Sequence, residues 1–217
     1  MIHKKLLGSF FNAVIFNALI KITSIYKISF IVGSHLAFFS LAMVTVPLSG
    51  AFTGILGSVL TFCLRVLISL FFTHSFSLHL LAFYIPGLFG SLYWAISSKY
   101  LKVLPSLICI ILFLIHPIGC QAAVYSLFWL FPIAANFYWK ETLFVHALGS
   151  TFTMHAVGSI IWLYTIGLSP DAWLMLIPVV IVERLLFASS MVIVHRIIEW
   201  TLLLDATRFS FASIKVN

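Results

Sequence analysis

The stretch Leu176-Ile-Pro-Val-Val-Ile-Val-Glu-Arg-Leu-Leu-Phe-Ala188 decides the fold class of this chain. It lies inside an apolar run, 172–203, that exceeds the roughly 20 residues a helix needs to cross about 30 Å of hydrocarbon. The whole chain has the same character, because 63% of its 217 residues are apolar and 8% are charged. A soluble domain carries roughly 25% charged residues. The composition excludes a soluble globular fold and predicts an all-α, polytopic integral membrane helix bundle.

Several apolar runs are candidates for membrane-spanning helices, and their lengths predict six to eight transmembrane helices. The six long runs are 28–46, 50–72, 80–98, 119–137, 142–168 and 172–203, and the two short ones are 6–20 and 103–116. These runs are continuous, whereas a transmembrane β-barrel has alternating segments of roughly 10 residues. The turn signal His116-Pro-Ile-Gly119 favours 103–137 as a helical hairpin, because Pro disfavours helix before it and Gly permits tight geometry.

The positive charges predict the orientation of the chain, since Lys and Arg in short loops mark the cytoplasmic side. If the chain crosses six times, Lys99 and Lys102 lie outside the cytoplasm, against this rule. If it crosses eight times, Lys21 and Lys27 do so instead. The rule therefore does not decide between the two arrangements, which place 28–98 in opposite orientations. Both arrangements place the N- and C-termini in the cytoplasm, as expected for a multi-pass protein of the cell inner (plasma) membrane.

Two regions follow from the pattern along the chain. Residues 1–27 predict a basic signal-anchor or an interfacial helix, because Asn12 and Asn17 interrupt the apolar stretch and no small-residue cleavage pattern follows it. Residues 28–217 contain no linker, charge block or low-complexity tract, and they predict a single transmembrane helical domain.

Charged side chains at bilayer depth are costly, and each is a candidate functional group. All five acidic residues lie in the last 77 positions, so Glu183 is the one acid expected near mid-membrane. Its partner is either the adjacent Arg184 or Arg65, the latter only in the eight-span arrangement. Pro178 is expected to kink this helix and free carbonyls toward a cavity. The charges either lock helices together or contact a solute.

A polar stripe on 142–168 is the second candidate site. At 100° per residue, Thr151, His155, Ser159 and Trp162 share one face. Hydrogen-bonding groups beside a Trp suit a flat polar ligand, although small polar residues also permit close helix packing. His146 lies on the opposite face, so the two histidines cannot chelate one metal from this helix.

Several functions lack their motifs in this sequence. There is no nucleotide-binding loop, no His-Glu-x-x-His and no Gly-x-Ser-x-Gly, and no catalytic residue, metal ligand or cofactor is predicted. The formal charge of +7 is spread over the membrane flanks. It is explained by orientation and by contact with anionic lipid rather than by nucleic acid.

Two patterns concern the packing and continuity of helices. Gly50-x-x-x-Gly54 permits another helix to approach closely. Pro86-Gly87 interrupts 80–98, as in the broken helices that border substrate sites in transporters.

Three features over 28–203 carry a family resemblance. They are a compact six-helix core, the Gly50-x-x-x-Gly54 helix after a Val46-Pro47 break, and a last helix with Pro178 and Glu183-Arg184. In this layout the chain resembles the substrate-binding subunits of energy-coupling-factor vitamin transporters. The resemblance implies a vitamin-like ligand near the outer face, a separate transmembrane scaffold subunit and a pair of ATPases. The chain departs from the family in lacking an Ala-x-x-x-Ala motif in the first long span and in having two additional apolar stretches.

The leading hypothesis is a small-solute transporter or its membrane substrate-binding subunit. Its site would be built from His155, Thr151, Ser159, Trp162 and Glu183-Arg184. Counting Arg65, the interior has two positive charges and one negative, which favours an anionic solute. The alternatives are a structural or assembly membrane protein, and an intramembrane enzyme using His155 and Glu183 as acid and base.

Overall fold

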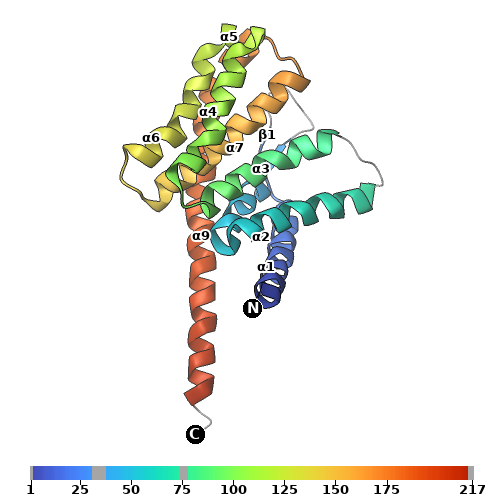
Figure 1. The fold of residues 1–217 in the computed structure, drawn as a ribbon, viewed down its shortest axis with the longest axis vertical. Helices are drawn as coiled ribbons and strands as arrows, with labels where there is room; N and C mark the ends of the chain where they lie inside the picture. The colour runs from blue at the N-terminus through green and yellow to red at the C-terminus, as the bar shows by residue number, and fades with distance from the viewer. Residues whose placement is uncertain (1, 31–37, 74–77, 215–217) are drawn as a thin grey trace.

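The computed structural model describes the backbone of residues 2–30, 38–73 and 78–214, and the side chains of 7–27, 40–72 and 83–201. The described chain is helical apart from one two-stranded sheet (Figure 1). Its elements are α1 (Ile2–Thr23), β1 (Lys27–Phe30), β2 (Phe38–Ser40), α2 (Ala42–Thr73), α3 (Leu78–Ala95), α4 (Lys99–Ile115), α5 (Pro117–Gln121), the 3-10 helix η1 (Ala123–Leu130), α6 (Phe131–Phe137), α7 (Leu143–Thr165), α8 (Pro170–Met175) and α9 (Ile177–Ile214).

Three helices of the described residues are long and apolar enough to cross a membrane: Ala42–Phe72, Leu143–Thr165 and Ile177–Thr201. Shorter apolar helices cover Leu7–Thr23 and Ala123–Phe137. The expected helical class with membrane-length helices is confirmed, whereas six long spans are not. Large apolar side chains are also widely exposed on these helices, as expected for surfaces that contact lipid.

The expected span 28–46 is wrong, because its described residues do not form one helix. Lys27–Phe30 pairs antiparallel with Phe38–Ser40, and residues 31–37 lie outside the described part of the chain. A short run rich in β-branched and aromatic residues suits a strand as well as a helix, and hydrophobic periodicity does not separate the two. Helix α2 begins at Ala42 and continues through Pro47, where a break was expected.

The real break in α2 lies at Gly54, whose φ of 68° is in the left-handed region that favours glycine. A network of buried hydroxyls ties both sides of this break to α3. Ser91 Oγ lies 2.8 Å from Ser49 Oγ and donates to Ser58 Oγ at 2.7 Å. At Gly50 the two backbones meet, since a Cβ there would overlap the carbonyl oxygen of Ser91. Close helix packing at Gly50 is therefore confirmed.

Gly50→Ala is expected to lower the free energy of unfolding by about 1–3 kcal/mol, because the added methyl forces α2 and α3 apart. The measurement is thermal unfolding of the purified protein in detergent. Gly8→Ala is the matched control, since a Cβ on Gly8 would meet nothing within 4 Å. It should leave stability unchanged or slightly raised, and equal losses in the two variants would contradict this packing.

The segment 103–137 forms the expected hairpin, with α5, η1 and α6 returning alongside α4 (Figure 1). At the turn, His116 Nδ1 accepts a hydrogen bond from the Ile118 backbone N–H at 3.2 Å, and Pro117 occupies the first turn of α5. The returning half of the hairpin consists of three short helices. The single span expected over 119–137 is therefore wrong.

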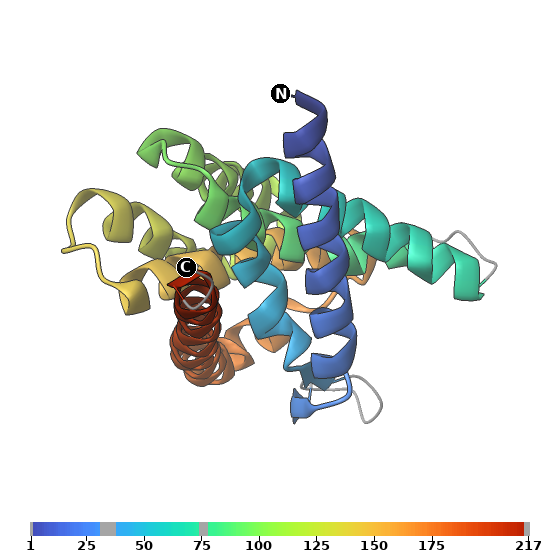
Figure 2. The same ribbon diagram turned by 90° about the horizontal axis from the view of Figure 1, so that it is seen from below.

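The last apolar run, 172–203, is divided at Leu176 between α8 and α9. Pro178 therefore lies in the first turn of α9, where a missing backbone N–H costs little, and the expected mid-helix kink is not found. Pro86 likewise lies within a continuous α3 rather than at a break. The 38 residues of α9 would be about 57 Å long at 1.5 Å per residue. Its C-terminal half projects from the bundle (Figure 1), and α1 runs across the direction of α9 (Figure 2).

An aromatic stack brings the ends of several helices together. The ring of Trp94, near the end of α3, lies 4.5 Å from the ring of His146 on α7 and 5.5 Å from the ring of His195 on α9. Lys102 Nζ of α4 lies 5.5 Å from the ring centroid of Tyr93, one residue before Trp94. The C-terminal end of α3, the N-terminal ends of α4 and α7, and the middle of α9 therefore meet at one end of the bundle, termed here the charged end.

The charged end contains several charged and titratable side chains from α4, α7, α9 and the segment before α7. His146 pairs with Glu141 at 3.6 Å, and Glu199 accepts from Arg196 at 2.8 Å. Lys99 and Lys102 lie at this same end, in the first turn of α4. Lys99, Lys102 and Arg196 therefore lie at the same end of the described helices.

Candidate functional site

A cavity of about 150 Å³ lies where η1, α7, α8 and α9 meet, with α2 and α3 contributing to its wall. Aromatic side chains from three elements contribute to its lining: Phe83, Trp162 and Trp173. Its polar lining groups are Tyr125 of η1, His155 and Ser159 of α7, and Glu183 and Arg184 of α9.

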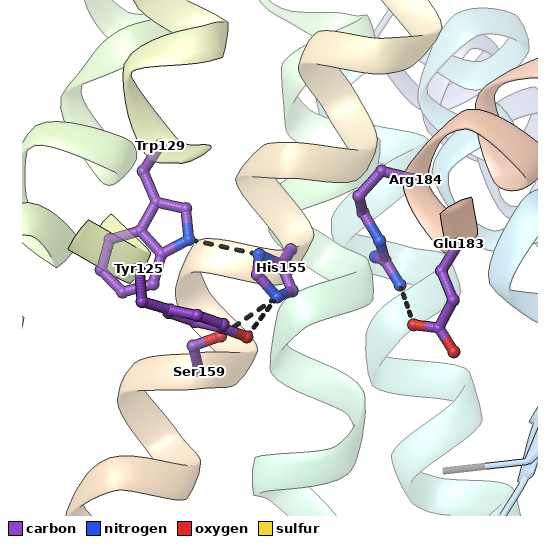
Figure 3. Close-up of polar contacts among 6 residues, drawn as sticks. All are labelled: Tyr125, Trp129, His155, Ser159, Glu183 and Arg184. Atoms are coloured by element: carbon purple, nitrogen blue, oxygen red, sulfur yellow. Dashed lines mark hydrogen bonds and ion pairs between the residues drawn. The ribbon is translucent and has the colours of Figure 1, made fainter. Parts of the chain in front are cut away.

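The hydrogen bonds of His155 fix the position of its ring proton (Figure 3). Trp129 Nε1–H donates to His155 Nδ1 at 3.2 Å. An indole N–H is a donor only, so Nδ1 is the acceptor and the imidazole is neutral with its proton on Nε2. That nitrogen lies 2.8 Å from Tyr125 Oη and 3.5 Å from Ser159 Oγ. Residues on η1 thus hold the imidazole of α7 in one tautomer.

The same chain of bonds determines what Tyr125 offers to the cavity. Because His155 Nε2–H donates to Tyr125 Oη, the phenol accepts this bond and keeps its own hydrogen for another acceptor. Ser159 also interacts with this hydroxyl. Tyr125 is 2% exposed and lines the cavity, so its O–H is available to Ser159 or to a group inside the cavity.

The opposite wall carries the ion pair of α9 (Figure 3). Arg184 Nη2 donates to Glu183 Oε2 at 3.3 Å, and the two residues are 4% and 9% exposed. The guanidinium carbon also lies 4.8 Å from the ring centroid of Phe187. This pair joins neighbours on a single helix, and both residues line the cavity. The positively charged donor Arg184 and the negatively charged acceptor Glu183 therefore lie across the cavity from His155.

The structure brings most of the predicted site residues together. Those that line the one cavity are His155, Ser159, Trp162, Glu183 and Arg184.

Two predicted residues lie apart from this cavity. Thr151 is 1% exposed and lies one turn before His155, and its Oγ1 has no hydrogen-bond partner among the described residues. Arg65 lies over the ring of Tyr84, with its guanidinium carbon 4.4 Å from the centroid. The considered Arg65–Glu183 pair is not found among the ion pairs of the described side chains.

Sequence reasoning missed Tyr125 and Trp129, the two residues that orient His155. They lie four positions apart in a segment expected to be one apolar span. In that setting a Tyr and a Trp read as packing or interfacial residues. The missing signal is the contact of η1 with α7, which joins positions 26 and 30 residues apart in the chain.

No protein-family model, curated protein or solved structure matches this chain. Among the described residues, no group of three or more His, Cys, Asp or Glu side chains lies where it could hold a metal ion. The cavity offers hydrogen-bond donors and acceptors together with aromatic side chains.

Proposed function

We propose that this chain is a multi-pass membrane protein that binds a small solute in the cavity between η1, α7 and α9. It would act as a transporter or as the membrane substrate-binding subunit of one. The observation that carries the proposal is the convergence of polar groups from three helices on one largely apolar cavity. Ligand sites have this composition, with a few polar groups placed in an apolar lining.

The lining indicates the chemistry of the solute. Tyr125 O–H and the guanidinium of Arg184 are donors, so the solute needs a hydrogen-bond acceptor such as a carbonyl or carboxylate. Trp162 and Trp173 offer aromatic faces to a flat group. The volume of about 150 Å³ is below the roughly 300–1,000 Å³ of drug-sized sites, which favours a small ring or the ring portion of a vitamin-like molecule.

The proposal includes the partners that the family resemblance implies. The chain has no nucleotide-binding loop, so energy for uptake would come from a separate transmembrane scaffold subunit and ATPases. The charged end would face the cytoplasm of the inner membrane, because it gathers Lys99, Lys102 and Arg196.

Tyr125→Phe is expected to reduce solute retention about fivefold, because one hydrogen bond contributes about 1 kcal/mol. The measurement is mass spectrometry of the small molecules released from the purified full-length protein, normalised to folded protein. Tyr164→Phe is the matched control, since its hydroxyl donates to the Leu112 carbonyl outside the cavity. Unchanged retention in Tyr125→Phe, or equal losses in both variants, would contradict the proposed role of Tyr125.

A structural or assembly protein is the rival function, favoured by the mutual pairing of Glu183 and Arg184. Under that function the cavity groups fix helix packing only. Substitutions there would lower thermal stability, and the purified wild-type protein would carry no solute.

A further inference from the structure

A second and larger space, of about 440 Å³, lies between α3, α4 and α7. This space, termed here the α3–α4 groove, is lined almost entirely by apolar side chains such as Phe89, Ile108 and Ile161. Lys102 is the one charged residue among its described lining residues. Neighbouring side chains on α4 are open to the surroundings, with Leu101 54% and Leu104 47% exposed. The groove is therefore accessible from the surface that contacts lipid.

Lys102 has an unusual environment for an ammonium group. The residue is 8% exposed, and its Nζ lies 5.5 Å from the ring centroid of Tyr93. Within the side chains that the structure describes, no carboxylate lies within salt-bridge distance of it. A buried charge is costly unless a group of opposite charge accompanies it. The buried ammonium group of Lys102 therefore favours the binding of an anion at this end of the groove.

The length of the groove fits one leaflet of a bilayer. Its lining on α4 extends from Leu101 and Lys102 to Leu112, which is about 15 Å at 1.5 Å per residue and about half of a 30 Å hydrocarbon core. Lys102 lies at the charged end of the bundle, where headgroups are expected, and the apolar lining extends from there toward the bilayer centre.

We propose that the α3–α4 groove binds one acyl chain of an anionic phospholipid, whose phosphate contacts the ammonium group of Lys102. The apolar lining accommodates the chain, and the single lysine selects a negatively charged headgroup. Basic pockets between transmembrane helices on the cytoplasmic side bind anionic lipid headgroups in this way. The site is separate from the solute cavity and does not depend on the proposed function.

Glu141 moderates this charge selection. Its carboxylate acts electrostatically on Lys102, but its side chain is 77% exposed and lies 3.6 Å from His146. An exposed carboxylate is well solvated and neutralises a neighbouring charge only in part. Removal of this carboxylate should therefore strengthen binding of the anionic lipid.

Lys102→Gln tests the proposal by native mass spectrometry of the full-length protein with phosphatidylglycerol and phosphatidylcholine of identical acyl chains. The wild type should retain more phosphatidylglycerol, and Lys102→Gln should reduce that excess about fivefold, the factor for one lysine at an anionic surface. Glu141→Gln should increase it. Lys99→Gln is the matched control, because Lys99 is exposed on the same turn and does not line the groove.

Two further measurements distinguish the contribution of the acyl chain to binding from that of the headgroup. Ile161→Trp fills the groove and should reduce retention of the anionic lipid while leaving Lys102 in place. A thermal unfolding curve shows that this variant is folded, and Ile108→Phe repeats the test from α4. Inorganic phosphate should not displace the lipid. Equal retention of the two lipids, equal effects of Lys102→Gln and Lys99→Gln, or displacement by phosphate would overturn the proposal.

Discussion

Arg184→Met is expected to lower the free energy of unfolding by about 3–5 kcal/mol, because it leaves the carboxylate of Glu183 buried without its neighbouring cation. Glu183 is 9% exposed and Arg184 is 4% exposed, so water cannot replace the lost interaction at low cost. Methionine keeps an unbranched apolar stem but is shorter than arginine and lacks the guanidinium. The loss therefore combines the removed charge with the lost contact of the guanidinium over the Phe187 ring.

Two matched variants make this prediction specific. Glu183→Gln combined with Arg184→Met removes both charges and should recover most of the stability, since buried ion pairs are often replaceable by uncharged groups. Arg196→Met removes one partner of an exposed pair, with side chains 67% and 39% exposed, and should cost less than about 1 kcal/mol. Thermal unfolding in one detergent compares all three. If Arg184→Met proves as mild as Arg196→Met, the buried-pair account fails.

The placement of the candidate site residues on α7 was largely predictable from the sequence. A helix over 142–168 follows from apolar length, and α7 occupies 143–165. Helical periodicity then places His155, Ser159 and Trp162 on one face, and all three line the cavity. Thr151 shares that face but lies one turn away, buried against the bundle. Periodicity determines the face of a residue, but not how far along the helix the cavity extends.

Features that depend on contacts between distant segments were not predictable. Hydropathy cannot show that Tyr125 and Trp129 of η1 contact His155, because a hydropathy pattern carries no information on tertiary contacts. The hairpin of β1 and β2 was missed for a related reason, since a short apolar run suits a strand or a helix. Pro178 was placed in mid-helix because hydropathy does not register the break between α8 and α9.

His155→Phe is the second substitution for which we expect a large effect. It should reduce solute retention at least about tenfold. The phenyl ring is somewhat larger than the imidazole, so the loss does not come from a hole in the lining. It removes the acceptor for Trp129 Nε1–H and the donor to Tyr125 Oη. The phenol is then free to rotate, and the cavity loses its oriented donor.

The most direct test of the account is the content of bound small molecule per folded protein, measured on the purified wild type, His155→Phe and Thr151→Val. Thr151→Val is the control, because it removes a buried hydroxyl that has no hydrogen-bond partner within the described part of the chain and does not line the cavity. We predict a bound solute in the wild type and in Thr151→Val, and its loss in His155→Phe. A wild type without any solute, or the same content in all three proteins, would contradict it.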